Sequence, residues 1–239
     1  MIYKLAEKFK DLKNELDNNV LFDVYARYDD NEDLIPPHLN IQLMVLNGED
    51  GDDDDESYVP QFAFGLDDSF KELIEATWGN MMKYVGSFEN KEFRGSYSFI
   101  APRKFLEEDP WLADLVEEDN KNYDVIKNLR VFDTTNVKYQ FGCINYQKDS
   151  SKEIFENEIY LFHDEHLISL NLTFSEYLNS CIELMACENW QLLFTDPTEV
   201  SRYSKELNQL KVSYDLFLNI FPEKDFELFK KKLIEHSLL

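Results

Sequence analysis

The sequence is poor in the residues that cross-link or interrupt a chain. Its 239 residues include three cysteines, seven glycines and seven prolines. Three cysteines are too few, and odd in number, for a disulfide framework, so we expect Cys143, Cys181 and Cys187 to be reduced, small core residues. With 44% hydrophobic and 15% aromatic residues, the composition is that of a globular protein in which disorder can only be local.

Long apolar runs and positive charge are also scarce. No stretch approaches the roughly 18 apolar residues of a membrane span, and the first eight residues are charged rather than signal-like, which predicts a soluble, cytoplasmic protein. Only 24 Lys and Arg stand against 48 Asp and Glu, a formal net charge of −24. Nucleic-acid binding and adsorption to anionic lipid both need a basic surface, so this charge argues against both.

The acidic residues gather in two stretches. The first contains Glu49, Asp50, Asp52, Asp53, Asp54, Asp55 and Glu56, and the second contains Glu107, Glu108, Asp109, Asp114, Glu117, Glu118 and Asp119 with no Lys or Arg. Residues 197–239 hold seven acids and seven bases, so residues 1–196 carry the entire −24. Runs of like charge repel themselves and are typical of solvated loops. Their functional interpretation is a recognition surface for a basic partner.

Apolar spacing and turn residues predict most elements. Helices are expected at 1–18, 36–48 and 69–78, and strands at 21–26, 58–66, 97–100, 128–132, 138–145, 158–162, 167–170 and 190–194. Thr173 and Glu176 have the spacing of a capping box and begin another helix.

The character of the chain changes near residue 196. Asp196 as a cap, with Pro197 at the first helical position, predicts a helix that starts there. Pro222 ends that helix, and Phe226 begins the apolar face of a last one. These features separate residues 1–196 from a helical extension at 197–239, which either completes the fold or forms an oligomer contact.

The segment from His163 to His166 is the nearest candidate for a metal site, because it holds two imidazoles and two carboxylates. Its histidines are three residues apart at a strand end or turn, whereas a zinc-protease helix places them four apart. We therefore interpret it as a surface turn, with a metal-dependent enzyme as a remote alternative.

Other catalytic and cofactor signatures are missing. The sequence contains no GxSxG, GxGxxG or GxxxxGK motif, and the run at 49–56 lacks the EF-hand register for calcium. We expect no catalytic residues, no metal and no cofactor.

Three segments, in this order, carry a family resemblance. The first joins 34–39 and 45–49, a proline followed by a helix and Asn-Gly; the second is 64–75, a strand passing into a helix after an acidic loop. The third is 159–178, a closing hairpin and a helix, followed by Asn189-Trp190. Over residues 34–196 this order is similar to the SUKH superfamily, which includes fungal regulators of cell-wall glucan synthesis and many bacterial immunity proteins.

The resemblance implies an α+β domain at 1–196, with a mainly antiparallel sheet flanked by helices, followed by the extension at 197–239. It also implies a non-enzymatic protein that binds another protein. Combined with the charge, it leads to the hypothesis of an immunity protein whose two acidic stretches bind a basic, nuclease-type toxin. The alternative is a regulatory scaffold of cell-wall synthesis or signalling. The sequence leaves the oligomeric state open.

Overall fold

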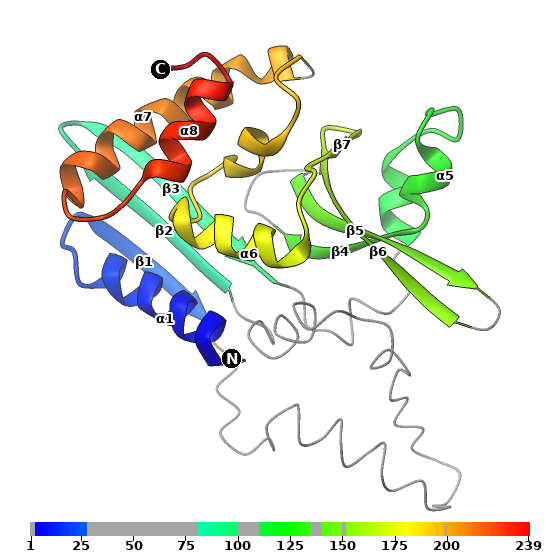
Figure 1. Ribbon diagram of the computed structural model, residues 1–239, viewed down its shortest axis with the longest axis horizontal. Coiled ribbons are helices and arrows are strands. Elements are labelled where there is room, and N and C mark those ends of the chain that lie inside the picture. Colours follow the sequence, from blue (N-terminus) through cyan, green and yellow to red (C-terminus); the bar gives the residue numbers. More distant parts are fainter. Residues whose placement is uncertain (1–2, 28–80, 100–109, 135–139, 150–151, 199) are drawn as a thin grey trace, which may run out of the picture.

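The computed structural model describes residues 3–27, 81–99, 110–134, 140–149, 152–198 and 200–239 (Figure 1). The elements are α1 (Tyr3–Asp17), β1 (Phe22–Arg27), β2 (Met81–Phe88), β3 (Lys91–Ser98), η2 (Pro110–Leu115), α5 (Tyr123–Ile126), β4 (Leu129–Thr134), β5 (Gln140–Asp149), β6 (Lys152–His163), β7 (His166–Ser169), α6 (Phe174–Glu183), η3 (Trp190–Phe194), η4 (Val200–Tyr203), α7 (Ser204–Ile220) and α8 (Glu227–Glu235). The elements expected at 36–48, 58–66 and 69–78 lie outside the described residues.

The strands form two antiparallel sheets, so the α+β class with flanking helices is confirmed. Strands β1, β2 and β3 make a three-stranded sheet, and β4, β5, β6 and β7 make a four-stranded sheet in sequence order. Helices α7 and α8 lie over the three-stranded sheet, whereas α5 lies at the far side of the four-stranded sheet (Figure 1).

The four-stranded sheet buries both of its faces, and its side chains alternate accordingly. Ile144, Ile159 and Leu161 belong to the large core that also contains residues of α6. Their neighbours Cys143 and Phe162 belong to a smaller cluster with residues of η2 and α5. Short elements can therefore be held against this sheet by the apolar side chains that they contribute.

The β2–β3 hairpin was not predicted, because two glycines interrupt its apolar face. In the register of the hairpin Tyr84 faces Gly95 and Gly86 faces Phe93. A Cβ atom at Gly95 would lie only 2.3 Å from atoms of the Tyr84 ring, so the missing side chain makes room for the aromatic one. The strand expected at 97–100 overlaps the end of β3, which is Ser98, and residue 100 lies outside the described residues.

The C-terminal helices share the core of the rest of the chain. Phe217 of α7 and Phe229 of α8 are fully buried in the cluster that includes Phe9 and Leu12 of α1. The Phe217 ring stands 5.7 Å from the Phe93 ring of β3, in an edge-on arrangement. Helix α7 thus packs directly on the three-stranded sheet.

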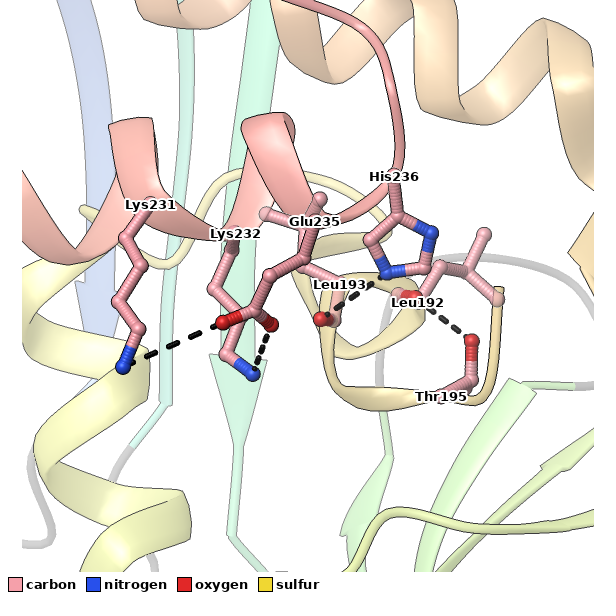
Figure 2. Close-up of polar contacts among 7 residues, drawn as sticks. All are labelled: Leu192, Leu193, Thr195, Lys231, Lys232, Glu235 and His236. Atoms are coloured by element: carbon pink, nitrogen blue, oxygen red, sulfur yellow. Dashed lines mark hydrogen bonds and ion pairs between the residues drawn. The ribbon is translucent and has the colours of Figure 1, made fainter.

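Polar contacts add to this packing where α8 ends (Figure 2). His236 Nε2 lies 3.2 Å from the carbonyl oxygen of Leu193 in η3. Lys232 pairs with Glu235 at 2.8 Å, and its ammonium group lies 4.8 Å from the centre of the Phe194 ring. The Lys232–Glu235 pair lies within α8, so the contacts with η3 are the His236 hydrogen bond and the Lys232 ammonium group at the Phe194 ring.

Most local predictions are confirmed by the observed α1, β1, β4, β5, β6, β7, α6 and α8. The capping box of α6 is complete, because Thr173 and Glu176 each accept a hydrogen bond from the other's backbone. The three cysteines are buried and free, as predicted, and burial raises the pKa of the Cys181 and Cys187 thiols.

Two predictions at the start of the C-terminal region are wrong. Residues 190–194 form the 3-10 helix η3 instead of a strand, because the run is buried on all sides and its apolar pattern has no period. Asp196 does not cap a helix at Pro197: its carboxylate accepts a hydrogen bond of 2.8 Å from the Thr198 amide, in an Asx-turn. The helical path begins at Val200, and α7 begins at Ser204.

A β-bulge in β4 sets the direction of one buried acid. Val131 pairs with Cys143 and Asp133 pairs with Gly142, so Phe132 is the extra residue. The bulge places Asp133 on the same side as Phe132, facing α6, instead of on the side of η2. Gly142 leaves room there, since a Cβ atom would lie 2.8 Å from Tyr177 Oη and 3.1 Å from Asp133 Cβ.

We predict that Gly142→Ala lowers the free energy of unfolding by about 1–3 kcal/mol, because the added methyl group overpacks a fully buried site. Denaturation in urea measures the change. Ser87→Ala, on an exposed strand position, is the control and should stay within about 0.5 kcal/mol of the wild type. Equal stability of the Gly142→Ala variant and the wild type would contradict the packing described.

Candidate functional site

The structure describes only part of the acidic surface predicted from the sequence. Residues 49–56 and the acids Glu107, Glu108 and Asp109 lie outside the described residues. Glu117, Glu118 and Asp119 are exposed in the connection between η2 and α5. Asp114, in η2, is also described and exposed. Glu117, Glu118 and Asp119 are consecutive and thus form one exposed acidic segment.

The segment between η2 and α5, which carries Glu117, Glu118 and Asp119, lies beside the turn between β6 and β7. Asn120 donates a hydrogen bond of 3.4 Å from its side-chain amide to the backbone oxygen of Glu165. Glu165 and its neighbour Asp164 form the two-residue turn and are exposed. Acids from two distant segments thus meet at one end of the four-stranded sheet. We call Glu117, Glu118, Asp119, Asp164 and Glu165 the acidic end.

Local hydrogen bonds hold both parts of the acidic end. Asp164 and Glu165 have φ values of 46° and 66°, the left-handed conformation that both central residues of a type I′ hairpin turn adopt. In the other part, the Asn120 amide donates to the Glu117 oxygen at 2.9 Å, and the Asn120 side chain accepts from the Asn122 amide at 2.9 Å. The acids therefore stand on turns of defined geometry.

The acidic end presents five exposed carboxylates of one sign of charge. Among the described residues, no Lys or Arg forms an ion pair with any of its five carboxylates, and Lys127 is already paired with Asp124. Asp164 has a histidine neighbour, with 3.8 Å between its carboxylate and His163 Nε2. Unpaired exposed charges of one sign act over about 8 Å at physiological salt. The acidic end can therefore attract a basic surface before contact.

The two histidines of the candidate metal segment are separated by the fold. They are cross-strand neighbours in β6 and β7, but His163 is only 4% exposed whereas His166 is exposed. The interpretation as a surface turn is thus wrong for His163, whose ring contacts Tyr203 of η4 with 4.8 Å between ring centres. Within the described ranges, no group of three or more His, Cys, Asp or Glu residues is placed to hold a metal ion.

Asp164 and Glu165 belong to the acidic surface although their sequence context, between two histidines, indicates metal ligands first. The available signal was two adjacent acids between two strand patterns, which is typical of an exposed hairpin turn. Their closeness to Glu117 depends on how η2 and α5 pack on the sheet. No local pattern in the sequence reveals that packing.

Comparison with known proteins identifies no relative. No family model matches the sequence, and no characterised protein or solved structure matches it. In the parts of the chain that the structure describes, no helix is long and apolar enough to cross a membrane.

The burial of His163 predicts a pH effect on stability. Burial lowers the pKa of His163 below its ordinary 6.5, against the opposing influence of Asp164 and Glu206. The unfolded chain then takes up this proton at a higher pH than the folded chain, so stability is lost as pH falls through 6.5. Thermal unfolding at pH 5.5 and 7.5 measures this effect. The melting temperature should fall less between pH 7.5 and pH 5.5 for His163→Gln than for the wild type.

The exposed His166 supplies the control for this measurement. His166→Gln removes a histidine from the same turn without removing a buried ring. A loss on acidification that is the same in His163→Gln as in the wild type would show that His163 is not responsible.

Proposed function

We propose that this chain is a non-enzymatic protein that binds a basic protein partner through its acidic surface. Its most specific form is a cytoplasmic immunity protein of the SUKH type that neutralises a basic, nuclease-type toxin. The observation that carries the proposal is the acidic end: five exposed acids from two segments, without a Lys or Arg counterion among the described residues. The net charge of −24 and the resemblance over residues 34–196 support it.

The physical advantage of such a surface is speed and selectivity of association. Complementary charge raises the rate at which a basic partner arrives and disfavours acidic competitors. The defined turns that carry the acids mean that little conformational entropy is lost on binding. Leu115 and Val116, partly buried just before Glu117, offer apolar area beside the charges, where the desolvated contacts of an interface form.

Affinity capture from the native cell tests the proposal, first at low ionic strength and then at high salt. One dominant basic protein, weakened by salt, is the expected result. Expression of that protein alone should then arrest growth, and co-expression with this chain should restore it. Several salt-resistant partners of mixed charge, or a captured protein that is harmless alone, would contradict the immunity proposal and favour a regulatory scaffold.

With the captured partner in hand, we predict that replacing Glu117, Glu118 and Asp119 by Lys slows association by about tenfold at low salt and flattens its salt dependence. Stopped-flow or surface-binding kinetics measure both quantities. Replacing Glu188, Asp215 and Glu223 by Lys is the control, because these exposed acids lie on other elements and the net charge changes equally. Equal slowing by both variants would mean that only net charge matters.

A further inference from the structure

The buried acid Asp133 joins the two sheets. Its side chain is 0% exposed, and its residue forms a bridge with Phe99 just beyond the end of β3. One carboxylate oxygen accepts a hydrogen bond of 3.0 Å from the Ser98 amide, and the other accepts one of 2.7 Å from the Tyr177 hydroxyl. A single carboxylate therefore connects β3 of one sheet, β4 of the other and helix α6.

The hydrogen bonds continue away from Asp133 through the core. The Gln191 side chain of η3 donates to Tyr177 Oη at 3.1 Å, and the Gln140 side chain of β5 donates to Gln191 at 3.2 Å. Asp133, Tyr177, Gln140 and Gln191 are each at most 1% exposed. The Tyr177 hydroxyl can both donate and accept, so it can accept a hydrogen bond from the carboxyl group when Asp133 gains a proton.

The Asp133 carboxylate accepts its hydrogen bonds from neutral groups, Ser98 and Tyr177. In the described part of the chain, no Lys, Arg or His makes a hydrogen bond or ion pair with this carboxylate. The groups that face it are Tyr177 and Cys181 from α6, the Ser98 amide from β3, Gln191 beyond Tyr177, and Gly142 of β5. Burial raises the pKa of Asp133 to about 6, although the hydrogen bonds from Ser98 and Tyr177 oppose the shift.

We propose that Asp133 is a proton-controlled latch at the junction of the two sheets. The protonated carboxyl group holds β3, β4 and α6 together, whereas its ionised form leaves a negative charge in the core and favours opening of the junction. The sign follows from linkage, since the pKa is higher in the closed state than the ordinary 3.8 expected after opening. The latch stabilises the closed junction most below about pH 4, and this stabilisation is lost as pH rises to about 6.

Hydrogen exchange of the Ser98 amide, at pH 5 and pH 7.5, tests the latch in the whole chain. After correction for intrinsic exchange, the protection factor should fall by about tenfold more in the wild type than in Asp133→Asn, which cannot ionise. Asp124→Asn makes the same change of charge on an exposed helix and is the control. A pH dependence in Asp133→Asn equal to that of the wild type would overturn the proposal.

A second variant keeps the proposal testable if Asp133→Asn fails to fold. Tyr177→Phe removes a hydrogen bond that favours the ionised carboxylate, so the pH at which protection is lost should move upward. A variant that weakened packing alone would lower protection at every pH and leave this midpoint unchanged. An unmoved midpoint, or no loss of Ser98 protection in the wild type between pH 5 and 7.5, would overturn the proposal.

Discussion

The meeting point of the two sheets depends on one buried carboxylate whose negative charge has no positive partner among the described residues. Three features of the chain put Asp133 there: the extra residue Phe132 turns it toward α6, Gly142 leaves space beside it, and Tyr177 supplies a hydroxyl. Such a group is costly to bury in its charged form. Its presence in place of an apolar side chain gives the junction a pH dependence that packing alone would lack.

The segment after α6 has an unusual backbone and contacts β2 and β3. Met185 and Ala186 have φ values of 58° and 50°, and both are fully buried. The Ala186 oxygen accepts a hydrogen bond of 2.8 Å from the Ser96 amide, and the Met185 oxygen accepts one of 2.8 Å from the Tyr84 hydroxyl. The strained turn therefore covers the edge of β3 and provides acceptors for its amide and for a buried tyrosine.

Charge and core are organised separately in this molecule. The core is rich in aromatic side chains, and helices α7 and α8 contribute to it. The extension that contains these two helices carries no net charge. The acidic end stands on η2, α5 and the β6–β7 turn, which pack on the smaller apolar cluster. Substitutions of the exposed acids should therefore change binding without changing the fold, which makes the proposed recognition surface open to charge reversal.

The sequence predicts those parts whose signals are local. The capping box at Thr173 is sufficient to predict the start of α6, and the amphipathic spacing is sufficient to predict α1, since both signals depend on residues a few positions apart. Three elements do not follow the usual periodicity. In η3 the side chains are buried on all sides, and in the β2–β3 hairpin glycines lie opposite aromatic rings. Before α7, an Asx-turn takes the place of a helix cap. Asp133 escaped notice for the same reason: its role depends on a bulge and on contacts with residues 35 to 44 positions away.

The titration of the Asp133 carboxyl group tests the central claim most directly. Carbon-detected NMR of the wild-type protein, with the resonance assigned through Asp133→Asn, follows the side-chain carbon from acid to neutral pH. A midpoint near the pKa of about 6 that burial produces would establish a protonated latch below neutrality. A midpoint at or below the ordinary 3.8 would mean that the carboxylate is ionised throughout and that the junction is held by some other interaction.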